Sequence, residues 1–350
     1  MVSPVPGSKL KNDKDALAEA VLAGDRRALA QAITLIESTR ADHRAGSNAL
    51  LERLMPHAGG SIRLGISGVP GVGKSTFIEA LGNYVIDTGH QVAVLTVDPS
   101  SAISGGSILG DKTRMELLSR RPEAYIRPSP AGRTLGGVTR RSREALILCE
   151  AAGFDVVIVE TVGVGQSETR VADMTDMFVL LQLPGGGDEL QGIKRGIMEL
   201  ADLVLINKAD DELKALAGRS AADYRNALRL LHPRSANWKV EVHTCSARDG
   251  DGIAEAWDIV LKHRSVHQAS GELEKRRSRQ ARDWMWSELG DNLMAALQGD
   301  PAVCEKIPSL EAAASEGRIP PTVAARQLLE LFLAGQGSCD IQENPGARDE

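Results

Sequence analysis

The sequence lacks the features that define several common classes of protein. It has no excess of positive charge, because 41 lysine and arginine residues are outnumbered by 47 aspartate and glutamate residues, for a formal net charge of −6. A nucleic-acid partner is therefore not expected. The four cysteines have no C-x-x-C spacing and the seven histidines form no cluster, so neither a zinc site nor a disulfide framework is predicted.

Long apolar runs are also missing. No stretch approaches the roughly 18 apolar residues that a membrane-spanning helix needs, and the first residues have no basic segment followed by an apolar core, as a signal peptide would. We therefore expect a cytoplasmic protein with no membrane partner. The strongly basic run Lys275–Arg279 is more typical of a solvated helix face than of a site for a polyanion.

The sequence does contain alternating helical and β-branched segments. Residues 14–55 have apolar side chains at helical spacing, with Gly24-Asp25 as a break between two helices, and His57–Gly60 has the composition of a hinge. Six β-branched runs follow, separated by mostly helical stretches: Ile62–Ile66, Val92–Val97, Val156–Val159, Met177–Leu183, Leu203–Ile206 and Val240–Thr244. This alternation predicts an α/β fold with a mainly parallel sheet, helices on both faces, and ligands at the carboxyl ends of the strands.

The sequence beyond these runs is helical in pattern. Gly252–His263 is expected to close the sheet domain, and Glu272–Leu297 is charged but carries a broad apolar stripe. A helix with that much apolar surface must cover the main domain or pair with another subunit, and we favour self-association. Pro308, Pro320 and Pro321 are expected to separate shorter helical pieces, and the polar tail is expected to be disordered.

One motif is far more specific than this general pattern. The stretch Gly68–Thr76, GVPGVGKST, fits G-x-x-x-x-G-K-[ST] and follows a β-branched run, which is the context of a phosphate-binding P-loop. Backbone N–H groups of such a loop and of the following helix converge on a phosphate. Lys74 would reach the β- and γ-phosphates, and Ser75 would offer its hydroxyl to Mg²⁺. The expected nucleotide-binding residues are Gly68, Val69, Pro70, Gly71, Val72, Gly73, Lys74, Ser75 and Thr76.

A second motif specifies the base. Asn207-Lys-Ala-Asp210 is an N-K-x-D sequence that follows an apolar run. The Asp210 carboxylate can accept hydrogen bonds from N1–H and the 2-amino group of guanine, which adenine lacks. Asn207 would orient the loop and meet the base edge, and Lys208 would lie over the ring. A small-residue turn after the last run would let backbone amides approach the guanine carbonyl; its residues are Ser246, Ala247 and Arg248. GTP is therefore favoured over ATP.

Acidic residues at the ends of other runs supply a candidate metal site and a candidate switch. Asp98 ends the second run and Asp111 follows a glycine-rich loop, and both are candidates for the Mg²⁺ shell, directly or through water. Glu160 ends the third run and could hold a metal-bound water. Gly163 follows three residues later, and its amide could contact the γ-phosphate and move when that phosphate leaves.

With these motifs in place, the chain closely resembles the MeaB/ArgK/MMAA family of P-loop GTPases, the G-protein chaperones of adenosylcobalamin-dependent acyl-CoA mutases. The similarity covers residues 15–300 and rests on long strings that P-loop chemistry in general does not require. The strings are GVPGVGKST, VDPSS, GGSILGDKTRM, IRPSP, TLGGV, CEAAGFDVVIVETVGVGQSE, GDELQGIKRGIMELAD and NKAD.

The resemblance implies a division of the chain and a set of partners. An N-terminal helical extension (1–60) would precede a P-loop GTPase domain (61–264), a helical dimerisation arm (265–335) and a disordered tail (336–350). The ligands would be GTP, GDP and Mg²⁺. The protein would form a homodimer and would gate adenosylcobalamin loading of an acyl-CoA mutase, most often methylmalonyl-CoA mutase. Intrinsic turnover would be slow, on the order of 10⁻⁴ to 10⁻³ per second, and stimulated by the partner.

The resemblance also implies roles for particular residues. By motif match, phosphate and magnesium contacts fall on Lys74, Ser75 and Thr76; metal binding and hydrolysis fall on Asp98, Asp111 and Glu160; and guanine recognition falls on Asp210. Pro184–Gly196 would be a mobile loop that couples nucleotide state to the partner through Asp188, Glu189, Gln191 and Lys194. The sequence departs from the family at Ala102 and Ile103, where a basic or hydroxyl residue is missing. This weakens the case for a phosphate contact there.

Three other functions stay open from the sequence. A nickel-insertion GTPase would have a histidine-rich or Cys-His tract, which is not seen. A kinase acting on a transport protein would need a separate acceptor-binding domain, and none is visible. A scaffold could bind nucleotide without hydrolysing it, and a measurement of phosphate release would distinguish it.

Overall fold

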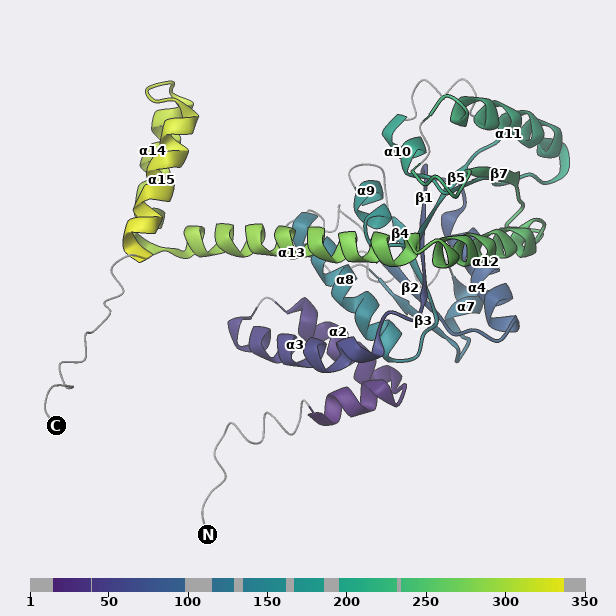
Figure 1. The fold of residues 1–350 in the computed structure, drawn as a ribbon, viewed down its shortest axis with the longest axis horizontal. Coiled ribbons are helices and arrows are strands. Elements are labelled where there is room, and N and C mark those ends of the chain that lie inside the picture. Colours follow the sequence, from purple (N-terminus) through teal and green to yellow (C-terminus); the bar gives the residue numbers. More distant parts are fainter. Residues whose placement is uncertain are drawn as a thin grey trace, which may run out of the picture. The chain divides into compact units, whose positions relative to one another are not determined.

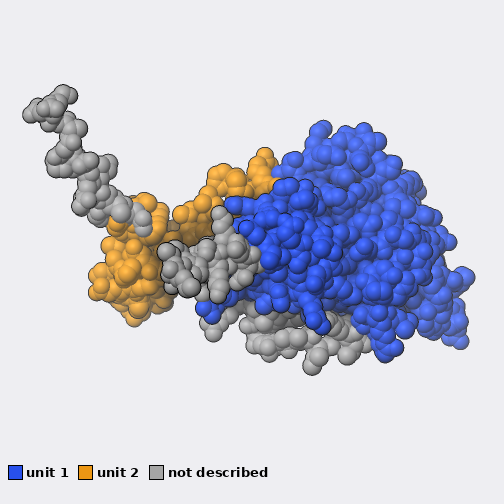
Figure 2. Space-filling view, turned by 90° about the horizontal axis from the view of Figure 1, so that it is seen from below, with its two compact units in different colours: residues 1–280 blue, residues 281–350 orange. Residues whose placement is uncertain are grey.

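The computed structural model describes residues 15–38, 40–97, 115–128, 135–161, 167–185, 195–231 and 234–336. The chain forms two compact units, residues 1–280 and residues 281–350, coloured separately in Figure 2. The expected tail at 336–350 lies outside the described residues except for Gln336, which ends the last helix. Within the described ranges no helix is both long and apolar enough to span a membrane.

The first unit is built on a seven-stranded parallel sheet with the strand order β3-β2-β4-β1-β5-β6-β7 (Figure 1). Its strands are β1 (Ile62–Gly68), β2 (Val92–Val97), β3 (Ala124–Arg127), β4 (Val156–Thr161), β5 (Met177–Gln182), β6 (Leu203–Ile206) and β7 (Glu241–Thr244). The six runs predicted from the sequence are all strands, and the α/β fold with a parallel sheet is confirmed. The prediction missed the edge strand β3, because its four residues lack a recognisable run of β-branched side chains.

Helices cover both faces of the sheet, as Figure 1 shows. One face packs against α4 (Lys74–Asp87), α7 (Glu116–Ser119) and α12 (Ile253–Ala269). The other face packs against α8 (Leu135–Ala151), α9 (Ser167–Ala172), α10 (Arg195–Leu200) and α11 (Lys214–Leu228). Alternate residues along each strand enter opposite clusters: Val156 and Ile158 face α4, whereas Val157 and Val159 face α8.

The N-terminal region packs on the outer side of α8. It contains a helix at residues 15–22, then α2 (Arg26–Glu37) and α3 (Ala41–Leu54). The break at Gly24-Asp25 is confirmed, since the Asp25 carboxylate caps α2 by accepting from the amides of Arg27 and Ala28. The sequence predicted two helices where the structure has three. Ser38 is extended and ends α2, and this second break carries no glycine or proline signal.

The amino edge of the sheet is held by buried ion pairs. Arg63 at the start of β1 donates from Nε and a terminal nitrogen to Glu150 of α8, both at 2.8 Å. Burial alone would raise the pKa of Glu150, but hydrogen bonds from Arg63, Ser61 and the Gly59 amide hold that pKa below its ordinary value. The helix α13 (Glu272–Gly299) joins this edge, since Arg277 lies 2.6 Å from Asp176 and Arg276 lies 3.2 Å from Asp202.

The second unit contains the rest of α13, α14 (Pro301–Ser315) and α15 (Pro321–Gln336). Asp300 caps α14 and Pro301 occupies its first turn, where a missing N–H costs nothing. Pro308, which the sequence analysis placed between helical pieces, lies inside α14. That prediction was wrong, because the packing of α14 against α15 outweighs the intrinsic cost of an interior proline. Pro320 and Pro321 do separate two helices.

Candidate nucleotide site

The P-loop motif forms a tight turn between the end of β1 and the start of α4. The local geometry requires glycine at positions that include Gly68 and Gly73. A Cβ atom at Gly68 would come within 2.5 Å of the Leu181 carbonyl oxygen. Gly73 has φ +90°, and a Cβ atom there would lie 2.9 Å from the side chain of Asn207. The loop can adopt this conformation because glycine permits both a close approach of another chain segment and a left-handed backbone.

Lysine and the helix start give this turn its positive character. The Lys74 ammonium donates to the Gly68 carbonyl at 2.8 Å and lies 3.5 Å from that of Val69, so it stays over the loop. The first α-helical bond runs from the Phe77 amide to the Gly73 carbonyl at 2.9 Å. The amides that precede it have no acceptor within the helix and are available to an anion.

Asn207 joins this loop to the base-recognition motif. It follows β6 and is 2% exposed. Its side-chain amide donates to the Val72 carbonyl at 2.8 Å, while its carbonyl oxygen accepts from the Ala247 amide at 3.1 Å and from the Cys245 thiol at 3.6 Å. One buried side chain thus connects three loops at the carboxyl edge of the sheet. In this arrangement the Ala247 amide is bonded to Asn207.

Asp210 lies at the mouth of the same group of loops. Its carboxylate accepts from the Ser246 hydroxyl at 3.4 Å and lies 3.5 Å from the Arg248 guanidinium. Arg248 is largely exposed and also pairs with Asp211 at 2.8 Å and Asp249 at 2.9 Å. Hydrogen bonds from Arg248 and Ser246 hold the pKa of Asp249 below its ordinary value. The Asp210 carboxylate is therefore held among hydrogen-bond donors and remains half-buried.

The backbone of the base loop is unusual. Lys208 has φ +58° and Asp211 has φ +42°, left-handed values that non-glycine residues rarely adopt. The Ala209 amide donates to the Cys245 carbonyl at 3.0 Å, which ties the β6 and β7 loops together. Burial raises the pKa of Cys245 to about 12, so this thiol is a packing group and not a nucleophile.

Glu160 lies at the carboxyl end of β4 and is 4% exposed. It is paired in register with Ile66 of β1, and the alternation of β4 places it on the face that packs against α4. The next residue, Thr161, donates from its hydroxyl to that of Ser67 at 2.8 Å on the opposite face. The end of β4 is thus fixed beside the P-loop, with a carboxylate on the P-loop side.

Several predicted residues lie outside the described part of the chain. They are Asp98, Asp111 and Gly163, the loop positions Ala102 and Ile103, and the coupling residues Asp188, Glu189, Gln191 and Lys194. The structure brings together the P-loop, Glu160, Asn207, Asp210 and the Ser246–Arg248 turn.

Known proteins resemble this chain over almost its whole length. The family model described as methylmalonyl-CoA mutase-associated GTPase MeaB matches residues 29–302. The chain belongs to the MeaB family. A relative named as a putative GTPase, from Caulobacter vibrioides, is 57% identical over 320 residues, covering 91% of this chain and 98% of that protein. The fold and these relatives agree on a GTPase that binds guanine nucleotide.

Two further relatives carry more specific names. The mouse (Mus musculus) protein named methylmalonic aciduria type A homolog, mitochondrial, is 49% identical over 328 residues, covering 91% of this chain and 79% of its own. The solved structure titled LAO/AO transport system kinase is 37% identical with a TM-score of 0.73, and the match covers 95% of this MeaB-family chain and 100% of the other.

The sequence analysis predicted that Asn207 would orient its loop, but it missed other residues that hold the site together. Ser67 and Cys245 have no motif of their own, although each is adjacent to one. The carboxylates around Arg248 could have been found, because Asp211 and Asp249 are direct neighbours of motif residues in the sequence. The link between Asn207 and Val72 could not, since the two residues are far apart in the chain.

Proposed function

We propose that this MeaB-family chain is a GTP-hydrolysing chaperone that gates adenosylcobalamin loading of a cobalamin-dependent acyl-CoA mutase and protects that enzyme, with methylmalonyl-CoA mutase as the client. The observation that carries the proposal is the Asn207 bridge between P-loop and base loop, found in a chain of a family described as mutase-associated. The methylmalonic aciduria type A homologues support the choice of client.

The geometry supports a division of labour among the nucleotide contacts. The triphosphate would lie on the amides at the start of α4, with Lys74 turning from the Gly68 carbonyl to the phosphate oxygens. The guanine edge would be read by the Asp210 carboxylate, with Ser246 and Arg248 holding that carboxylate in place. Asn207 would position both halves of the site and contact the base edge.

Mg²⁺ fits the oxygen donors near the γ-phosphate position. The Ser75 hydroxyl is in the first turn of α4, and the Glu160 carboxylate is on the sheet face that α4 covers. Hydroxyl and carboxylate oxygens are the ligands Mg²⁺ prefers. A bound Mg²⁺ would neutralise charge on the phosphates during transfer. We assign Asp98 and Asp111 to the same shell and Gly163 to γ-phosphate sensing from the sequence motif alone.

We propose that residues 265–335 act as a homodimerisation arm, beyond an N-terminal extension (1–60) and a GTPase domain (61–264). Large apolar side chains of α13 are exposed in the second unit; they are Met285, Trp286, Leu289, Leu293 and Met294. Contiguous apolar surface of this kind is rare on a monomer. Sedimentation of the Leu289→Glu/Leu293→Glu variant should give a monomer where the native chain gives a dimer.

The proposal is tested by measuring phosphate release from GTP with and without methylmalonyl-CoA mutase. The chain alone should turn over slowly, on the order of 10⁻⁴ to 10⁻³ per second, because positioning and Mg²⁺ act without a partner-supplied group. The mutase should stimulate this rate, and adenosylcobalamin transfer to the apo-mutase should depend on GTP. Rapid hydrolysis by the chain alone, or cofactor transfer that ignores the nucleotide, would contradict the proposal.

A second candidate is a kinase that acts on a transport protein, since a solved relative carries that title. Incubation with γ-labelled GTP and candidate transport proteins separates the two. Label released only as inorganic phosphate supports the GTPase, whereas label on the acceptor protein supports the kinase.

A further inference from the structure

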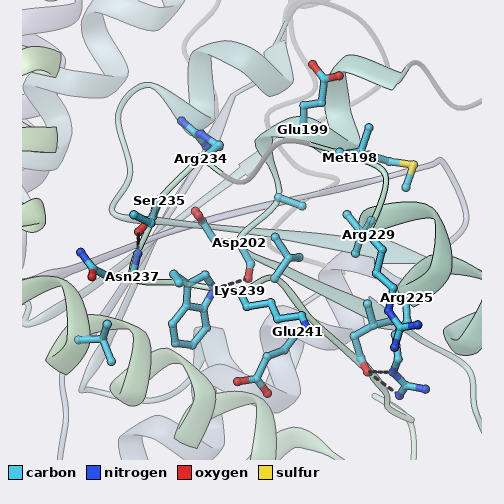
Figure 3. A pocket seen from close by; sticks show the side chains of 18 of the residues that line it. Met198, Glu199, Asp202, Arg225, Arg229, Arg234, Ser235, Asn237, Lys239 and Glu241 are labelled. Carbon is cyan, nitrogen blue, oxygen red and sulfur yellow. Dashed lines mark hydrogen bonds between the residues drawn. The ribbon is translucent and has the colours of Figure 1, made fainter.

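A pocket of about 920 Å³ lies at the amino edge of the sheet, away from the P-loop and base loops. Its walls come from the end of α10, from α11 and the segment after it, from β7, and from α12 (Figure 3). The residues before β6, Ala201 and Asp202, line it, whereas Asn207 and Asp210 follow β6 at the other edge. None of the nucleotide-site residues described above borders the pocket.

The pocket has a largely apolar lining. Its apolar residues include Met198, Leu228, Leu231, Trp238, Val240 and Val266. The Trp238 indole N–H donates to the Asp202 carbonyl at 2.8 Å, so its ring is fixed. Small-molecule sites in proteins are commonly about 300 to 1,000 Å³ and mostly apolar, with a few polar groups that set orientation. This pocket has the size and lining of such a site.

Its charged groups favour an anion. The basic lining residues are Arg225, Arg229, Arg234, Lys239 and Lys262, against the acidic Glu199, Asp202 and Glu241. Two of the acids are already paired, Asp202 with Arg276 and Glu241 with Lys262. Since the chain as a whole has a net charge of −6, this concentration of positive charge is local.

The basic side chains that line the pocket differ in the partners that they already have. Arg225 donates to the Val242 carbonyl at 2.7 Å, and Arg234 donates to the Leu200 carbonyl at 2.7 Å. Both partners are neutral, so the two guanidinium charges are not compensated by these bonds. The side chains of Arg229 and Lys239 have no hydrogen bond or ion pair to any residue that the structure describes. Figure 3 shows Arg229 with Arg225 on one side of the view, Arg234 on the other side, and Lys239 between them.

We propose that this pocket binds a small organic anion, a carboxylate or a phosphate ester with an apolar body. Arg229 and Lys239 hold the anionic head, because theirs are the lining cationic side chains without a partner among the residues that the structure describes. The body lies against Trp238 and Val266. The site is independent of the GTP site, and its failure would leave the proposed GTPase function unaffected.

The test uses three probes that share one apolar chain: hexyl phosphate, hexanoate and hexanol, titrated into the full-length protein by calorimetry. Both anions should bind, and hexanol should bind at least about 10-fold more weakly. The two anions distinguish a phosphate site from a carboxylate site by their relative affinities. Equal binding of hexanol, or no binding of either anion up to about 10 mM, overturns the proposal.

Substitutions test whether the two anions bind in this pocket. Arg229→Glu/Lys239→Glu should reduce hexyl phosphate affinity at least about 10-fold. Lys275→Glu/Lys306→Glu makes the same charge change at exposed positions that do not line the pocket and should leave affinity unchanged. Val266→Trp should weaken both anions by filling the pocket. GTP hydrolysis should stay native in all three variants. Equal loss in the two charge-reversal pairs would mean non-specific attraction and would overturn the site.

Discussion

Asp202 lies just before β6 and Asp210 lies just after it, so these two carboxylates belong to opposite edges of one sheet. Asp202 is 2% exposed and accepts from the Phe178 amide at 2.9 Å and from Arg276. Burial alone would raise its pKa, but the Arg276 charge holds the pKa below its ordinary value. Among the residues that the structure describes, the Asp210 carboxylate makes longer contacts, at 3.4 Å to Ser246 and 3.5 Å to Arg248.

Carboxylates at the amino edge and at the carboxyl edge of the sheet therefore have different roles. At the amino edge, Asp202, Asp176 and Glu150 are closely paired with arginines, which fixes α8 and α13 on the sheet. At the carboxyl edge, Asn207 joins the loops while Asp210 stays half-buried. A carboxylate whose partners are all internal contributes to folding, whereas one with weak internal contacts can serve a ligand. Substitutions at the two edges should separate stability from nucleotide binding.

The largest effect is expected for Asp210→Asn. In this variant an NH₂ group replaces one carboxylate oxygen; it can donate to the C2 carbonyl of xanthine but cannot accept from the 2-amino group of guanine. Preference for GTP over xanthosine triphosphate should shift by a factor on the order of 10³ or more, measured by competition binding. The exposed neighbour Asp211→Asn is the control and should bind GTP normally. A variant that keeps its preference for GTP would remove Asp210 from base recognition.

Asp202→Asn tests the amino edge. It leaves the Arg276 guanidinium without its buried counter-charge, so the free energy of unfolding should fall by about 3 to 5 kcal/mol in urea titrations. The folded variant should bind GTP with native affinity. Asp283→Asn, at an exposed pair with Arg282, should change stability by less than about 1 kcal/mol. If the variant lost GTP affinity but kept its stability, the amino edge would serve nucleotide binding and not folding, which would contradict the comparison.

Asn207→Ala should affect both properties at once. It removes the bonds to the Val72 carbonyl and the Ala247 amide and leaves those buried groups unpaired, which should lower stability by about 2 to 3 kcal/mol. GTP binding should weaken together with stability. Asn83→Ala removes a side-chain amide that donates to the Glu79 carbonyl of its own helix, and it is the matched control. Normal GTP affinity in the Asn207 variant would show that the bridge is not needed for binding.

A smaller, pH-dependent effect is expected at His263, which is buried beside Asp202, His267 and Arg276. Burial lowers the pKa of His263 to about 4. An unfolded histidine titrates near 6.5, so between these values the unfolded chain binds more protons and the folded state loses stability as pH falls. Between pH 7 and pH 5 this loss is about 2 kcal/mol. His263→Gln should remove it from urea titrations at the two pH values. An unchanged pH dependence would contradict the pKa shift.

The sequence predicts a structural feature when the residues that determine it are close together in the chain. The P-loop and the N-K-x-D motif are local strings, so Lys74 could be placed at the start of a helix, and Asn207 and Asp210 on the loop after a strand. The parallel sheet followed from six β-branched runs. Pairings between distant residues, such as Arg63 with Glu150, leave no local signal. Pro308 shows the same limit, since packing overrides the local preference of proline.

The central claim is that nucleotide chemistry at the carboxyl edge controls the mutase, and Lys74→Ala tests it most directly. GTP hydrolysis and GTP-dependent transfer of adenosylcobalamin to apo-methylmalonyl-CoA mutase are measured in the same preparation, with unfolding in urea as the check on the fold. The account predicts that both activities disappear while stability stays native. Transfer that still responds to GTP in a folded Lys74→Ala protein would contradict it.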